Sequence, residues 1–390
     1  MNGTDAFAAL GRKLRLGVIG GGPASFIGHI HRTAATLDGR FELVAGVVSS
    51  DPDRSRAGGR QLGLPRPYAT VAEMLDAERQ RADGIDAVAI MTPNDRHHAE
   101  CVAALEAGLH VICDKPLTNT VADAHDLVRR VRNGGNVFCV THPYAAYPMI
   151  RQARAMVAAG AIGPLRTVQV EYLQAGMAAR VEDGTLTPKL RWKLDTARSG
   201  PSLVLGDIGT HAHHLARFVT GLEVERLAAD LGALVPDRRV DDYAAMLLRL
   251  QGGVRGTLIV SQALAGTENS IVLRVFGETG HLEWTHERPN HLRHAPQNRA
   301  VQVMARGDPD LAAAEQRLVR IARGHPEGFL EAFANLYRDA AEAIAARLTG
   351  HPADPLALDF PTVADGAAGV AFIAAAICSR ARGGAWVDCT

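Results

Sequence analysis

The feature that most constrains this chain is a run of three glycines directly after a short apolar segment. Residues 14–19 are mostly apolar, Gly20 to Gly22 end that run, and a helical pattern begins near Ile27. This order predicts a strand, a tight turn and a helix, the first unit of a dinucleotide-binding βαβ fold. Glycines let the backbone approach a pyrophosphate, and the helix start offers its unpaired N–H groups to the anion.

The glycine turn is longer than usual before the next glycine, Gly28, that could pack the helix on the strand. This spacing predicts an enlarged phosphate loop. We expect the cofactor to contact this loop at Gly20, Gly22, Ser25, Phe26 and Ile27.

The residues at the end of the second predicted strand, residues 41–48, should determine whether the chain binds NAD or NADP. A carboxylate at this point binds the 2′-hydroxyl of NAD, whereas small polar or basic residues leave room for the phosphate of NADP. Ser49, Ser50 and Arg54 could serve a 2′-phosphate, but Asp51 argues for NAD unless it caps the next helix. The residues therefore leave NAD and NADP both open.

Strands and helices then alternate to about residue 140, which predicts a parallel, doubly wound sheet. Two predicted strands end in polar residues, at Thr92-Pro93-Asn94 and at Asp114-Lys115-Pro116, and His97 follows the first group. Ligands of such sheets bind at the carboxyl ends of the strands. We therefore expect Thr92, Pro93, Asn94, His97, Asp114 and Lys115 to contact the cofactor, although His97 could equally cap or pack.

After residue 141 the pattern changes to closely spaced alternating strands, which predicts a largely antiparallel sheet. The predicted strands are 166–172, 242–250, 255–261, 271–276 and 281–284, and polar residues 288–308 are expected to form a long loop. We expect an α/β fold with two domains. Residues 1–141 form the NAD(P)-binding Rossmann domain and 142–390 a substrate-binding and oligomerisation domain with a large open sheet.

Composition narrows the partners of this chain. It has 42 basic and 42 acidic residues, so no net field favours nucleic acid or a membrane surface. Its five cysteines lack metal-ligand spacing, and no signal peptide or transmembrane stretch is evident. These features predict a cytoplasmic protein.

Several sequence blocks together resemble the Gfo/Idh/MocA family of sugar and polyol oxidoreductases. They are the glycine turn, TPN-x-x-H at 92–97, AL-x-AG-x-HV at 104–111, DKPL at 114–117, G-x-IG at 160–163 and GDIGTH at 206–211. The resemblance covers nearly the whole chain and implies a Rossmann domain, a C-terminal domain whose open sheet often joins subunits, and a homodimer or homotetramer. Asp114 stands where the family usually has Glu, and Gly200-Pro201-Ser202 departs from the usual glycine-rich segment.

The resemblance also implies catalytic roles for Lys115, Asp207 and His211. Oxidising a secondary alcohol needs a base for the hydroxyl proton, and a histidine oriented by a carboxylate four residues earlier on a helix suits that task. Lys115 would stabilise the alkoxide as it forms. The structural alternative is a helix cap at Asp207 with a buried His211.

Other candidates have alternatives of comparable weight. Tyr144, Lys193 and His325 are predicted to line the substrate pocket beside Lys115, Asp207 and His211. A hinge tyrosine and an exposed lysine are the alternatives for the first two. A metal site at His211, His213 and His214 is disfavoured because adjacent helical positions point apart. Asp241 and Asp242 fit either a strand edge or an anchor for a neighbouring subunit.

The sequence thus predicts an NAD(P)-dependent oxidoreductase that transfers hydride between a ring carbinol of a sugar, inositol or glycoside and nicotinamide. Two alternatives stay open: an NAD-dependent enzyme that cleaves glycosides through transient oxidation, and a cofactor-bound regulator. Retention of Lys115, Asp207 and His211 together argues against the regulator.

Overall fold

The computed structural model describes residues 6–182, 184 and 188–389, which form two compact units. The first unit comprises the chain up to Thr118, Ala122–Pro143 and Phe329–Ala367; the second comprises Asn119–Val121, Tyr144–Gly328 and the chain from Ala368. The expected division was a single cut after residue 141. In the structure, Phe329–Ala367 groups with the first unit, so the chain leaves that unit and later returns to it.

The first unit is built on a six-stranded parallel sheet. Its strands are β1 Leu14–Gly20, β2 Phe41–Val47, β3 Arg66–Pro67, β4 Ala87–Met91, β5 His110–Cys113 and β6 Phe138–Val140. Their spatial order is β3-β2-β1-β4-β5-β6, so the topological switch lies between β1 and β4. This is the dinucleotide-binding Rossmann order, and it confirms the predicted doubly wound sheet.

Helices connect and cover these strands. They are α2 Phe26–Leu37, α3 Pro52–Gln61, α4 Val71–Arg79, α5 Asn94–Glu106 and α6 Val121–Gly134, together with α1 Ala6–Leu10, α12 Phe329–Thr349 and the 3-10 turn Pro355–Leu358. α12 packs on α2, where the Nδ1 atom of His31 lies 2.7 Å from the hydroxyl of Tyr337. The returning segment is therefore part of the core of the first unit.

The second unit contains a nine-stranded sheet in the order β14-β13-β12-β11-β7-β10-β9-β8-β15. The strands are β7 Leu165–Gln174, β8 Val224–Gly232, β9 Tyr243–Leu250, β10 Arg255–Ser261, β11 Asn269–Gly277, β12 Gly280–Thr285, β13 His291–Pro296, β14 Gln302–Ala305 and β15 Val387–Asp388. Only the central pair β7 and β10 is parallel among the pairs of this sheet that the structure describes. The largely antiparallel sheet was predicted, and the structure confirms it.

The expected long loop at residues 288–308 was wrong, because this segment contains β13 and β14 at one edge of the sheet. In β13 only Leu292 is buried, and β14 has no buried residue. Edge strands of this kind lack the alternation of buried apolar residues that identifies a strand from sequence. Strand β8, which the prediction also missed, lies near the opposite edge.

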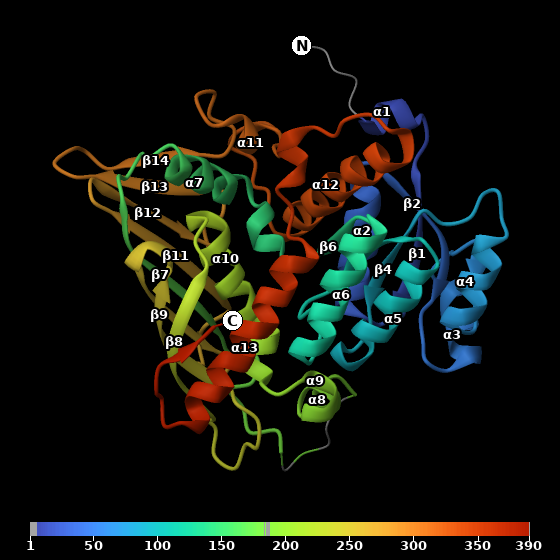
Figure 1. Cartoon of the computed structure of the whole chain (residues 1–390), viewed down its shortest axis with the longest axis horizontal. Coiled ribbons are helices and arrows are strands. Elements are labelled where there is room, and N and C mark those ends of the chain that lie inside the picture. Colours follow the sequence, from blue (N-terminus) through green and yellow to red (C-terminus); the bar gives the residue numbers. More distant parts are fainter. Residues whose placement is uncertain (1–5, 183, 185–187, 390) are drawn as a thin grey trace. The chain divides into compact units, whose positions relative to one another are not determined.

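Helices α7 Pro148–Ala158 and α10 Thr210–Thr220 pack on the nine-stranded sheet. The other helices after residue 143, apart from α12, are α8 Pro188–Lys193, α9 Thr196–Ser199, α11 Ala313–Gln316 and α13 Val363–Ala381, with a π-helical turn at Leu205–Gly209 and 3-10 turns at Pro143–Ala146 and Gln251–Gly253. Figure 1 shows α7 and α10 against the same face. The buried residues Val168, Val170 and Tyr172 of β7 alternate along this strand, as expected for one covered face.

Helix α13 deserves separate mention because its length and composition would suit a membrane span. Its 18-residue window has a mean hydropathy of 1.4, and 56% of that window is buried. Such a test is also passed by core helices of globular proteins. Here Phe372 of α13 stacks on His213, and the Ser379 hydroxyl accepts a hydrogen bond from the backbone of Ala229, which are the contacts of a core helix.

Candidate active site

The glycine turn at the end of β1 has the geometry that the sequence predicts. Gly20 and Gly21 have φ values of +82° and +65°, in the left-handed region that favours glycine. A Cβ on Gly22 would lie 2.8 Å from the carbonyl oxygen of Val48, and one on Gly28 would lie 2.4 Å from that of Gly21. The turn therefore needs its small residues, and it fits the close backbone approach that a pyrophosphate requires.

Helix α2 starts directly behind this turn. The Ser25 hydroxyl caps the helix by accepting a hydrogen bond from the Gly28 amide at 3.1 Å, while Phe26 is largely exposed and Ile27 half-buried. The guanidinium of Arg32 reaches back to donate to the carbonyl of Gly21. The predicted loop residues thus surround one helix N-terminus, where the helix dipole favours an anion.

The end of β2 is shaped by Asp51. Its carboxylate caps α3 by accepting from the Arg54 amide at 2.8 Å, and Ser49 Oγ accepts from the Asp51 amide at 3.1 Å. The guanidinium of Arg54 lies 3.6 Å from Asp51 and is mostly exposed. The structure confirms the predicted cap, so Asp51 is engaged within its own helix, with Ser49 and Ser50 beside it.

His97 joins the two polar strand ends of the first unit. Its Nδ1 lies 2.9 Å from the carbonyl oxygen of Pro116, and its Nε2 lies 2.9 Å from that of Thr92. Burial opposes a charge on this ring, but Cys113, Asp114 and the Pro116 carbonyl together raise the pKa of His97 to about 10. Through these two contacts the fully buried His97 holds the loops after β4 and β5 together.

The second of these loops carries Asp114 and Lys115. Asp114 Oδ1 accepts from the Lys115 amide at 2.9 Å and from the Thr141 hydroxyl at 2.7 Å, which fixes the backbone where the lysine begins. Thr92 Oγ1 donates to Glu100 at 2.5 Å, and Pro93 and Asn94 begin α5. These residues lie at the carboxyl ends of β4 and β5, the edge where Rossmann sheets bind their ligands.

In the second unit, Asp207 and His211 lie on one continuous helical segment. Asp207 is within the π-helical turn Leu205–Gly209, which leads directly into α10. Turns of this kind often occur at functional sites. The carboxylate of Asp241 accepts hydrogen bonds from the amides of Leu203 and Val204 at 2.6 and 3.2 Å. Asp241 therefore caps the segment that carries both predicted catalytic side chains, while burial raises the pKa of its carboxyl.

Two donors hold the carboxylate of Asp207. Lys193 Nζ forms a salt bridge with Oδ2, and Gln262 Nε2 donates to the same oxygen at 2.8 Å. Side-chain exposure is 16% for Lys193 and 26% for Asp207. Lys193 is therefore a partner of Asp207 rather than an exposed lysine.

Aromatic residues surround His211. Its ring lies edge-on to that of Tyr144, with centroids 5.0 Å apart, and the hydroxyls of Tyr144 and Tyr172 are 2.8 Å apart. Burial, with a smaller contribution from the Asp207 carboxylate, raises the pKa of both phenols. Tyr144, Lys193, Asp207 and His211 thus belong to one cluster of the second unit.

The three histidines near the start of α10 have different surroundings. His213 stacks on Phe372 with centroids 4.2 Å apart, and burial lowers its pKa well below the usual value. His214 stacks on Phe218, whereas His211 lies against Tyr144. Across residues 6–182, 184 and 188–389, no group of three His, Cys, Asp or Glu side chains is arranged to hold a metal ion.

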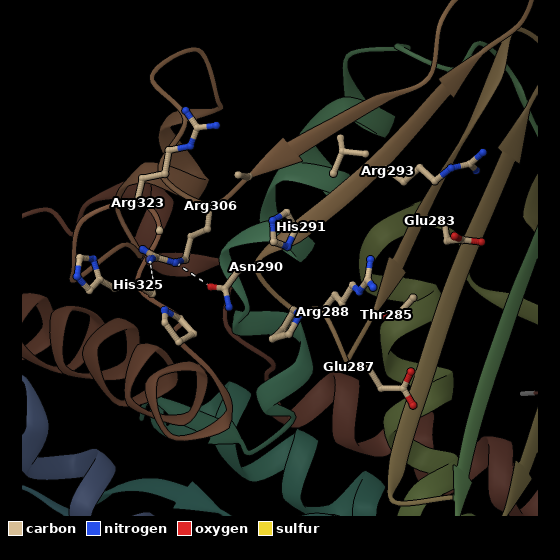
Figure 2. Close-up of a pocket in the computed structure, with 15 residues that line it drawn as sticks. Glu283, Thr285, Glu287, Arg288, Asn290, His291, Arg293, Arg306, Arg323 and His325 are labelled. Carbon is tan, nitrogen blue, oxygen red and sulfur yellow. Dashed lines mark hydrogen bonds between the residues drawn. The ribbon is translucent and has the colours of Figure 1, made fainter.

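His325 lies in a separate hollow of about 1070 Å³ beside β12, β13 and β14 (Figure 2). Arg306 organises this hollow: it forms a buried salt bridge with Glu327 at 2.8 Å and donates to Asn290 at 2.8 Å. Glu327 also accepts from the amide of Ile321, so it fixes the loop that precedes α12. The lining of this hollow includes none of the other predicted substrate residues.

The sequence analysis missed four polar side chains beside Asp207 and Tyr144. They are Tyr172 and Gln174 of β7, Gln262 just after β10, and Asn269 at the start of β11. Nothing in their local sequence distinguishes them from ordinary strand residues. The register of β7 with β10 and β11 brings them together, because Tyr172 pairs with Val260 and Ile271, while Gln174 pairs with Asn269.

A Rossmann sheet with an intact glycine turn, followed by a unit that presents acid, histidine and lysine side chains, defines a nucleotide-dependent oxidoreductase. Profile comparison agrees: residues 14–142 match the oxidoreductase family with an NAD-binding Rossmann fold, and residues 150–283 match the GFO/IDH/MocA C-terminal domain. The chain belongs to the Gfo/Idh/MocA family, and it is an oxidoreductase with an NAD-binding domain.

Individual relatives support this assignment over the whole chain. An uncharacterized oxidoreductase, YfiI of Bacillus subtilis (strain 168), is 33% identical over 387 residues, which are 97% of this chain and 98% of that protein. An inositol dehydrogenase homolog from Azotobacter vinelandii, solved with NADH and myo-inositol, is 38% identical, with a TM-score of 0.89 and complete coverage of both chains. Levoglucosan dehydrogenase of Pseudarthrobacter phenanthrenivorans is 26% identical over 72% of this chain and 76% of that enzyme.

Proposed function

We propose that this protein is an NAD-dependent dehydrogenase that oxidises a ring carbinol of an inositol, sugar or glycoside. The observation that carries the proposal is the cluster of Asp207, His211, Lys193 and Tyr144 in a chain whose Rossmann unit retains the glycine turn. The solved relative that binds myo-inositol with NADH supports a cyclic polyol as the substrate class.

In the proposed reaction, His211 removes the proton of the substrate hydroxyl, and Lys115 donates a hydrogen bond to the oxygen as negative charge develops. Asp207 supplies a carboxylate that favours the protonated imidazole after this transfer. NAD held at the glycine turn would supply the acceptor for the hydride of the carbinol carbon. Tyr144 and Tyr172 offer neutral hydroxyls to the neighbouring hydroxyl groups of a polyol.

We propose NAD rather than NADP as the cofactor. Arg54, the cation expected to serve a 2′-phosphate, is paired with the capping Asp51, and Asp53 adds a further carboxylate in the first turn of α3. A 2′-phosphate would meet this negative charge without a free cation from Arg54. The glycine turn and the N-terminus of α2 would hold the pyrophosphate.

We also propose that the protein forms a homodimer or homotetramer through the face of the nine-stranded sheet opposite α7 and α10. Leu247 and Ile259 on this face are 53% and 37% exposed. They lie on the adjacent strands β9 and β10, where Leu247 pairs with Thr257 and Ile259 with Ala245. Apolar side chains gathered on a sheet face are typical of subunit contacts.

The test is NADH formation over a panel of inositols, aldoses and glycosides, with NAD and NADP in parallel. We expect oxidation of a cyclic polyol with NAD, and a loss of about 10²–10⁴-fold in kcat for Lys115→Ala and for His211→Ala while NADH still binds. Wild-type rates in either variant would remove that residue from the mechanism. Release of an aglycone from a glycoside without net NADH would instead favour the hydrolytic alternative.

A further inference from the structure

Asp207 accepts a hydrogen bond from a buried carboxamide, that of Gln262, whose position is fixed by its other contacts. Gln262 follows β10 directly, is 2% exposed, and has its backbone fixed by two hydrogen bonds, one to the Asp242 carbonyl and one from the Met177 amide. Its side-chain Nε2 donates to Asp207 Oδ2 at 2.8 Å and to Gln174 Oε1 at 3.1 Å. Both N–H groups of the carboxamide are therefore in use.

The orientation of this carboxamide is dictated by its surroundings. Among the described residues, Oε1 of Gln262 is buried without a hydrogen-bond partner. The opposite orientation would direct that oxygen at the carboxylate of Asp207, so that two acceptors would face each other. An unpartnered buried oxygen is unfavourable, so the donor contacts to Asp207 and Gln174 are what determine the orientation of this carboxamide.

Gln174 continues the same polarity across the sheet. Because its Oε1 accepts from Gln262, its Nε2 faces the other side and donates to Asn269 Oδ1 and to the Tyr172 hydroxyl. The Tyr172 hydroxyl also donates to Asn269 Oδ1 at 2.9 Å, and it therefore accepts the hydrogen bond that joins it to the Tyr144 hydroxyl. A continuous hydrogen-bonded row thus links Asn269 to Gln174 and Gln262, and Gln262 donates at both of its ends, to Gln174 and to Asp207.

We propose that Gln262 is a positioning residue for Asp207: it fixes the carboxylate in the orientation used in catalysis and joins it to the polar row from β7 and β11. This inference rests on the proposed function, because it assigns Asp207 a part in the reaction. Lys193 binds the same oxygen by a salt bridge, but a lysine is a flexible point charge. The carboxamide, whose backbone and second N–H are both fixed, supplies the direction that the ammonium cannot.

The test compares the wild-type protein with Gln262→Met and Gln262→Glu. Met keeps the size of the side chain and removes the donor, so we expect kcat to fall about 10–100-fold with KM within about threefold. Loss of an N–H donor disfavours the ionised carboxylate, so the rising limb of the pH profile of kcat/KM should move to higher pH. Glu has the shape of Gln but places an acceptor against Asp207. The kcat of Gln262→Glu should therefore be lower than that of Gln262→Met at pH values where both carboxyls are ionised.

A role in packing alone predicts the reverse order, with Glu the milder change, and leaves the pH profile unmoved. Gln80→Met is the control, because Gln80 is exposed at the end of α4 in the first unit; its kinetics should match the wild type. A wild-type kcat and an unshifted pH profile in Gln262→Met would overturn the inference. The kcat of Lys115→Ala tests the proposed function separately.

A structural measurement decides the inference even if no panel substrate is oxidised. Crystal structures of the wild-type protein and Gln262→Met should differ in the position of the Asp207 carboxylate while Gln174 stays on Asn269. An Asp207 side chain that is unchanged in the variant would overturn the proposal. A failure of the whole substrate panel would count against the proposed function only.

Discussion

At the scale of single residues, Gly22 offers the sharpest test of the cofactor site. A Cβ at this position would lie 2.8 Å from the carbonyl oxygen of Val48, which is backbone and cannot rotate away. We expect Gly22→Ala to displace the turn and weaken NADH binding by about tenfold or more, measured by fluorescence titration. Gly232→Ala is the control, because a Cβ there meets nothing within 4 Å; equal affinities in both variants would mean that the turn does not hold the cofactor.

The residues that the sequence identified in the candidate site share one property: each stands in a short motif with its own chemical signature. Lys115 follows a buried strand, and Asp207 and His211 share one helical segment. Gln174, Gln262 and Asn269 have no such signature, since a single amide in a strand is ordinary. Only the register of β7, β10 and β11 brings these three amides together, and register is a long-range property that local sequence does not specify.

At the scale of elements, the packing of α2 on α12 makes the first unit sensitive to acid. Burial lowers the pKa of His31, which lies between Phe333 and Tyr337, to about 4. An unfolded chain would protonate this histidine below about pH 6.5, so the stability that it contributes is present above that pH and is lost as the pH falls toward 4. The loss amounts to about 3 kcal/mol.

We therefore expect the wild-type protein to lose more thermal stability than His31→Gln between about pH 7.5 and about pH 4.5. The measurement is the melting temperature of each protein across this range. His29→Gln provides the control, because His29 is exposed on the same helix. Parallel curves for the wild type and His31→Gln would show that the histidine is not neutral in the folded protein.

Elements differed in how well the sequence predicted them, for a physical reason. Strands β1, β4 and β5 are buried on both sides by helices, so each is a largely apolar run. Strands β13 and β14 form an edge and bury almost nothing, so their composition is that of a loop. The return of α12 to the first unit was not predictable either, because an amphipathic helix does not specify which sheet or helix it will cover.

At the scale of the whole molecule, the proposed subunit contact depends on the sheet face that carries Leu247 and Ile259. Two carboxylates placed on this face would have to be buried in the contact, and burying an unpaired charge costs several kcal/mol. We expect light scattering to give the wild-type protein a mass that is a multiple of the 41.5 kDa chain. The double variant Leu247→Asp, Ile259→Asp should run as a single chain.

The matched control is Leu348→Asp, because Leu348 is 46% exposed but lies on α12 in the first unit. This variant should keep the wild-type mass. If the double variant also kept it, the contact would have to lie elsewhere, whereas a single-chain wild type would refute the oligomer itself. Asp207 accepts a hydrogen bond from Gln262, which directly follows β10, the strand that carries Ile259. We therefore also expect dissociation to lower kcat in the double variant and not in Leu348→Asp.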